Sequence, residues 1–141
     1  MGEYNKALED YDKAIQISPK KMSVYYNRAL LYQLKGQQNK ALEDYNSAIQ
    51  VNPDSAEALE NRAMIYQDMG EQSKALEDYN RAIQLKPNKA NIYFNRALLH
   101  QDMCEQHRAL EDYNCAIRLK PDYTNAISNR DVLLKIMKHK V

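Results

Sequence analysis

The sequence has little of what disulfide frameworks and phosphate-binding loops are built from: two cysteines and three glycines in 141 residues. Two cysteines are too few for a disulfide framework, so a reducing compartment is the default and we expect a cytoplasmic protein. A glycine-rich phosphate loop is missing, as are the H-E-x-x-H and G-x-S-x-G signatures of metalloproteases and serine hydrolases. These absences predict that the protein is not an enzyme.

Charge of one sign and long apolar runs are also missing. Twenty basic residues nearly balance nineteen acidic ones, whereas proteins that bind nucleic acids or membrane surfaces normally carry a basic excess. No apolar run approaches the roughly 18 residues that a membrane span needs. We therefore expect neither nucleic acid nor membrane as a partner. With 44% hydrophobic and 28% charged residues, the chain should bury a core.

A long internal repeat dominates the chain. The motif LEDY-x-x-AI-x-x-x-P occurs four times, and its copies begin 34 residues apart. A fixed period of this length indicates an array in which each unit is a small supersecondary structure. The motif begins at Leu8, Leu42, Leu76 and Leu110, and an Asn-Arg pair keeps the same period at Asn27-Arg28, Asn61-Arg62, Asn95-Arg96 and Asn129-Arg130.

Each unit is predicted to hold two helices. Small and apolar residues recur at intervals of three and four over 41–49 and again over 56–69, which is a helical stripe. Pro53 ends the first of these helices, and Gly70 follows the second, as a left-handed C-terminal cap would. No segment alternates with period two, so no strands are expected. The predicted N-cap residues of the motif helices are Asn5, Asn39 and Ser73.

This pattern resembles the tetratricopeptide repeat (TPR) over essentially the whole chain, although Tyr25, Leu59 and Tyr93 replace the tryptophan often found there. The resemblance implies an all-α fold, an α-solenoid in which about eight helices form antiparallel pairs in a right-handed superhelix. The chain opens inside a repeat, which suggests an excised or engineered stretch of a longer array. We expect a partial repeat at 1–21 with the second helix only, full repeats at 22–55, 56–89 and 90–123, and a capping helix at 124–141.

Every unit also carries one arginine and one aspartate at fixed places. Each arginine lies 18 residues after one aspartate and 16 before the next, so antiparallel helices could bring either one alongside. We expect buried Arg–Asp pairs that set helix register, with an anion-binding arginine as the alternative. The residues are Arg28, Arg62, Arg96 and Arg130, with Asp10, Asp44, Asp78 and Asp112.

Two other features of the ladders have chemical interpretations. His100, Cys104, His107 and Cys115 have a ligand-like spacing, but Cys115 falls about 12 Å along its helix from the others, so we expect no metal and no cofactor. Cys104 stands where the other repeats have glycine, which should cost about 1 kcal/mol. In the last helix Asp131 replaces the alanine at which two helices of a repeat touch, a charge that is tolerable only because no partner helix follows.

TPR resemblance implies that the first helix of each repeat lines a concave groove. There a row of asparagines could hold a peptide main chain, since an amide has both donors and an acceptor. The alternative is that these asparagines tie neighbouring helices together. The predicted peptide-binding residues are Tyr26, Asn27, Leu30, Glu57, Glu60, Asn61, Met64, Asn91, Phe94, Asn95, Leu98 and Asn129.

The residues of this groove also predict the partner. Tyr26, Leu30, Asn91 and Asn95 stand where a carboxylate clamp for chaperone tails would need basic or matching polar residues. We therefore expect a neutral or basic, partly apolar protein or peptide, held by a protein–protein interaction scaffold. The alternative function is a self-assembling module that forms head-to-tail homo-oligomers through its uncapped ends. The apolar residues of those ends are Leu8, Tyr11, Ile15, Leu133, Leu134, Ile136 and Met137.

Overall fold

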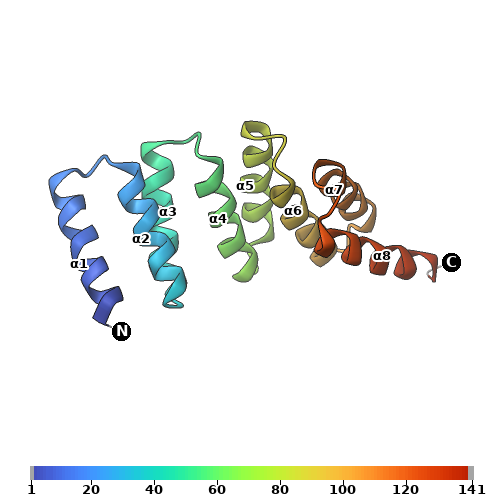
Figure 1. Cartoon of the computed structure of the whole chain (residues 1–141), viewed down its shortest axis with the longest axis horizontal. Helices are drawn as coiled ribbons and strands as arrows, with labels where there is room; N and C mark the ends of the chain where they lie inside the picture. Colours follow the sequence, from blue (N-terminus) through green and yellow to red (C-terminus); the bar gives the residue numbers. More distant parts are fainter. Residues whose placement is uncertain (1, 140–141) are drawn as a thin grey trace.

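The computed structural model describes residues 2–139 and confirms an all-α solenoid (Figure 1). In this range there are eight helices and no strands. The helices lie side by side in chain order, with the N-terminus at one end of the array and the C-terminus at the other (Figure 1). Their bounds are α1 Gly2–Ile17, α2 Met22–Leu34, α3 Gln38–Val51, α4 Ala56–Asp68, α5 Gln72–Leu85, α6 Ala90–Asp102, α7 Gln106–Leu119 and α8 Thr124–Lys138.

The helices fall into two kinds that alternate along the array. We call α2, α4, α6 and α8 the A helices, and α1, α3, α5 and α7, which carry the LEDY motif, the B helices. The most extensive contacts are between an A helix and the B helix that follows it, in the pairs α2–α3, α4–α5 and α6–α7. The division into repeats at the expected boundaries stays a prediction, and residues 1, 140 and 141 of the outer segments lie outside the described range.

The turns within these pairs confirm one prediction and correct another. Gly36 and Gly70 have φ of 75° and 79°, and Cys104, which replaces glycine in the third pair, is held at φ 62°. The N-cap prediction was wrong, because Asn5, Asn39 and Ser73 all lie inside helices. The tight left-handed turn is the reason: backbone bonds such as Gln37 N–H to the Tyr32 carbonyl close it, and the helix then begins at once.

The core repeats along the array around one tyrosine per pair. Tyr45, Tyr79 and Tyr113 are each 0% exposed. Beside them, alanines at the helix crossings are also completely buried, which lets the helix backbones approach closely. Because each cluster draws on neighbouring helices, the core is continuous and no pair is stable by its own contacts alone. The crossing alanines of the A helices are Ala29, Ala63 and Ala97.

The predicted Arg–Asp pairs are present, and the partner is the aspartate that follows the arginine by 16 residues. Arg62 binds Asp78 through Nε at 2.7 Å and Nη2 at 2.8 Å, and its Nη1 donates to Asn46 of the preceding B helix at 2.9 Å. The hydrogen bonds to Asp78 raise the pKa of Arg62. Each arginine therefore joins an A helix to the B helices on both sides. The equivalent pairs are Arg28–Asp44 and Arg96–Asp112.

Candidate peptide-binding surface

All twelve predicted site residues lie on A helices, in matching registers, and contacts between successive A helices join several of them. The Asn61 side chain donates to the Tyr26 hydroxyl at 3.0 Å, and that of Asn95 donates to Glu60 at 3.3 Å. We call this surface the A-helix face. The predicted residues on it are Tyr26, Asn27 and Leu30 of α2, Glu57, Glu60, Asn61 and Met64 of α4, Asn91, Phe94, Asn95 and Leu98 of α6, and Asn129 of α8.

The two central asparagines tie neighbouring A helices together, as one of the two interpretations required. Their amide N–H groups are engaged with Tyr26 and Glu60, so each retains mainly its carbonyl oxygen as a free acceptor. Asn27, at the N-terminal end of the row, is exposed and makes no side-chain hydrogen bond within residues 2–139. The asparagine with the most freedom to meet a peptide main chain is therefore at the edge of the row.

A second row of amides has a structural role that the sequence analysis missed. The hydroxyl groups of the buried tyrosines donate to the side-chain oxygens of glutamines on the A helices, and the Tyr79–Gln67 bond is 3.0 Å long. Without such an acceptor a buried hydroxyl would lose its hydrogen bond to water at a cost of about 1–3 kcal/mol. A glutamine 12 residues before each core tyrosine was the signal. The other pairs are Tyr45–Gln33 and Tyr113–Gln101.

Apolar side chains are left open on the A-helix face at one register. Leu30 is 37% exposed, Met64 is 40% exposed and Val132 of α8 is 56% exposed. Phe94 is less available, because its ring packs against Tyr123 at a centroid distance of 5.0 Å. The open row thus runs over several A helices and extends to Val132, which the predicted set did not include.

The carboxylates of this face differ in how they are compensated. Glu57 forms ion pairs with Lys86 at 3.4 Å and Lys89 at 3.5 Å, and its pKa is lowered by a backbone hydrogen bond and by these lysines. Burial raises the pKa of Glu60, whose hydrogen bond comes from the neutral amide of Asn95. Asp68 and Asp102 likewise accept only from glutamine amides, Gln38 and Gln67, both at 3.3 Å. Three carboxylates of the surface therefore have no cationic partner among the described residues.

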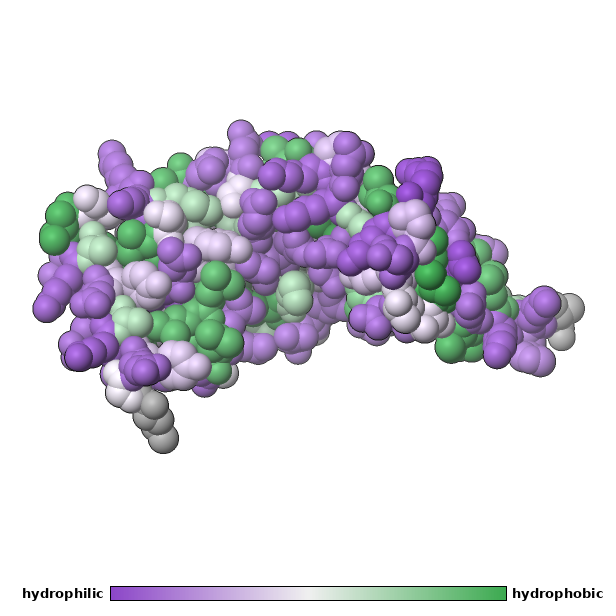
Figure 2. Space-filling model, in the orientation of Figure 1, coloured by the Kyte–Doolittle hydropathy of each residue, from purple (hydrophilic) through white to green (hydrophobic). Residues whose placement is uncertain are grey.

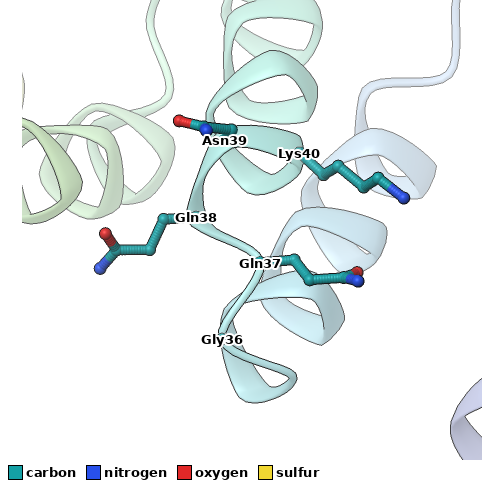
Figure 3. Close-up of a pocket in the computed structure, with 5 residues that line it drawn as sticks. All are labelled: Gly36, Gln37, Gln38, Asn39 and Lys40. Carbon is teal, nitrogen blue, oxygen red and sulfur yellow. The ribbon is translucent and has the colours of Figure 1, made fainter.

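A hollow of about 430 Å³ lies elsewhere, at the turn between α2 and α3 (Figure 3). It is lined by Gly36, Gln37, Gln38, Asn39 and Lys40. The side chains of Gln38 and Lys40 point away from each other on opposite sides of the turn (Figure 3), so this hollow has no convergent polar groups to bind a ligand.

The potential zinc residues are not brought together. Within residues 2–139 no three His, Cys, Asp or Glu side chains are placed to hold a metal ion. Cys104 and Cys115 are both free thiols. None of the described helices combines the length and the hydropathy needed to cross a membrane.

Solved structures of similar fold are repeat proteins. The crystal structure of MamA matches with a TM-score of 0.91 at 23% identity, over 97% of this chain and 80% of that one. A tetratricopeptide repeat protein from Parabacteroides merdae matches at 0.89 and 25% identity, over 98% of this chain and 55% of its own. The first TPR of Spaghetti (RPAP3), bound to the HSP90 peptide SRMEEVD, matches at 0.80 and 20% identity, over 84% and 94% of the two chains.

The family models agree with this fold. A TPR repeat model matches residues 1–36 and 64–103, and two tetratricopeptide repeat models match residues 23–55 and 45–77. No curated protein matches the chain. The matched segments together run from the first helix into the sixth, and the 34-residue period, the left-handed turns and the buried small residues explain them physically. The chain belongs to the tetratricopeptide repeat family.

Proposed function

We propose that this protein is an interaction scaffold whose A-helix face binds a peptide or a helical segment of a partner protein. The observation that carries the proposal is the row of open apolar side chains, Leu30, Met64 and Val132, at one register of successive helices. Apolar side chains gathered on a surface and bordered by polar groups favour a protein contact, because covering them releases the unfavourable hydration.

The charges of the face support a neutral or basic partner. Glu60, Asp68 and Asp102 have amide donors and no cation, so a lysine or arginine of the ligand would improve their solvation. The peptide bound to the first TPR of Spaghetti, SRMEEVD, carries three acidic residues. Such a ligand would be repelled here, where Tyr26 and Asn91 also supply no positive charge. A chaperone tail held by a carboxylate clamp is therefore not the ligand that we propose.

We also propose a non-catalytic role in the cytoplasm. TPR proteins generally act as scaffolds, and the conserved-period side chains of this chain are engaged in packing and helix pairing. Two free thiols support a reducing compartment.

The test is a titration of a fluorescent peptide library, sorted by charge and apolar content, followed by anisotropy. We expect the strongest binders to be basic and partly apolar, and their affinity to fall as salt is raised. Replacing Leu30 or Met64 with aspartate should weaken binding at least about tenfold, since interface anchors commonly contribute more than 1.4 kcal/mol. Val51→Asp on α3 is the matched control, because Val51 is 38% exposed but lies on a B helix.

The charge component is tested separately. Asp68→Asn with Asp102→Asn should weaken basic peptides and flatten their salt dependence, while neutral apolar peptides keep their affinity. The proposal fails if no peptide binds more tightly than millimolar. It also fails if Leu30→Asp and Val51→Asp have equal effects on the peptides that do bind.

A further inference from the structure

The first helix of the array has one face without a helix against it. This face, which we call the α1 face, consists of Ala7, Asp10 and Tyr11. Asp10 is exposed, and Ala7 and Tyr11 are only half-buried, whereas the same residue types at the same positions of α3 are 0–3% exposed. The difference has a single cause: α3 lies between two A helices, while the extensive neighbour of α1 is α2 alone. The matching residues of α3 are Ala41, Asp44 and Tyr45.

The interior pairs show which helix such a face accepts. In the pair of α4 and α5, Arg62 makes two hydrogen bonds to the Asp78 carboxylate, and the Tyr79 hydroxyl donates to Gln67. Between them lies Ala63, which is 0% exposed and allows the helices to touch. An A helix that fits a B helix is thus defined by the sequence Arg-Ala-x-x-x-Gln. The α1 face keeps all three complements: the small residue, the carboxylate and the hydroxyl.

A second copy of this chain offers α8 as the obvious occupant, which is the head-to-tail arrangement predicted as an alternative. Arg130 is in the correct register, but Asp131 replaces the crossing alanine and Lys135 replaces the glutamine. Docking would bury the Asp131 carboxylate where its partners are an alanine and a tyrosine ring, so its lost hydration would not be repaid. A protonated lysine also cannot accept a hydrogen bond from Tyr11. In the array, Asp131 is exposed and accepts from Arg130 at 3.3 Å.

Figure 2 shows hydrophobic residues reaching the surface over the first helices and again around α8, so both ends of the array offer apolar area. Apolar area alone would favour joining the two ends. The charges decide otherwise, because the exposed Leu134, at 41%, lies on the same helix as the carboxylate that docking would bury.

We propose that the α1 face is a docking site for an A-type helix of a partner chain, one that carries Arg-Ala-x-x-x-Gln, and that Asp131 and Lys135 keep α8 of a second copy off it. The carboxylate of Asp10 selects the arginine, Ala7 requires the small residue, and the Tyr11 hydroxyl requires the glutamine acceptor. This site is at the end of the array, on a B helix, and does not depend on the peptide-binding role of the A-helix face.

The first experiment uses a fluorescent peptide with the sequence of residues 88–103, which contains the α6 pattern of Arg96, Ala97 and Gln101. We expect it to bind the intact protein and to lose at least tenfold in affinity when its alanine is changed, as Ala97→Asp. Asp10→Lys on the protein should cause a similar loss, and the peptide change Arg96→Glu should then restore binding to that variant. Equal binding to wild type and Asp10→Lys, or no binding at all, would overturn the proposal.

The second experiment asks whether α8 is excluded for the stated reason. Sedimentation velocity over a concentration series should show wild type as a monomer. Asp131→Ala with Lys135→Gln gives α8 the A-type pattern, and we expect this variant to associate as concentration rises. Adding Asp10→Lys should return it to a monomer. These are exposed positions, and circular dichroism confirms that each variant is folded. A double variant that stays monomeric, or a wild type that associates in an Asp10-dependent way, would overturn the proposal.

Discussion

Replacing Asp78 with alanine should destabilise the array more than any single surface change. Asp78 accepts two hydrogen bonds from Arg62, at 2.7 and 2.8 Å, and the two side chains are 8% and 19% exposed. Removing one partner of a buried ion pair typically costs 3–5 kcal/mol, because the other charge is left without compensation. Arg62 keeps its bond to Asn46 and some contact with water, so we expect the lower end, about 3 kcal/mol.

Equilibrium urea unfolding followed by helical circular dichroism measures this loss. At a typical slope of about 1–3 kcal/mol per molar urea, the midpoint should fall by roughly 1–3 M. Asp10→Ala is the control inside the same chain, since it removes the same residue of the ladder where no arginine pairs with it, and it should change stability by less than about 0.5 kcal/mol.

The double change Arg62→Met with Asp78→Leu separates pair energy from buried charge. It should recover most of the loss, because apolar residues of similar volume often replace a buried ion pair without cost. If Asp78→Ala costs no more than Asp10→Ala, the view that this ladder holds helix register is wrong. A double variant as unstable as the single one would show instead that the attraction between the charges, and not an orphaned charge, is what matters.

Three further predictions concern single positions. Cys104→Gly should stabilise the protein by about 1 kcal/mol and raise the melting temperature by roughly 2–4 °C, because Cys104 is held at φ 62°. Gly70→Ala should have the opposite effect, and unchanged melting in both variants would contradict the argument. Burial lowers the pKa of His100, so the unfolded chain binds its proton more readily and stability should fall as pH drops below about 6.5. His100→Tyr removes this contribution, and urea midpoints of the two proteins that run parallel from pH 7.5 to 5.5 would refute it. Tyr79→Phe should cost about 1 kcal/mol in urea unfolding, since it removes a buried hydrogen bond, and a neutral result would mean that the hydroxyl is solvated in another way.

The candidate site could be located from the sequence, but its chemistry could not. The period placed Asn61 and Asn95 at equivalent positions of successive helices, and both interpretations of the row were open. Only the packed helices show that Tyr26 and Glu60 take up their amide hydrogens, because that depends on how far apart neighbouring A helices lie. The N-cap prediction failed for a similar reason, since backbone bonds of the left-handed turn start each helix without a side-chain cap.

The sequence by itself determined that this chain is a stack of two-helix units, since a 34-residue period in small and apolar residues permits only stacking of like on like to bury them. The tertiary structure decided which of two aspartates each arginine binds. Sequence separations of 16 and 18 residues are nearly equal, and only the closer packing of an A helix on the B helix that follows it brings Asp78, not Asp44, within reach of Arg62.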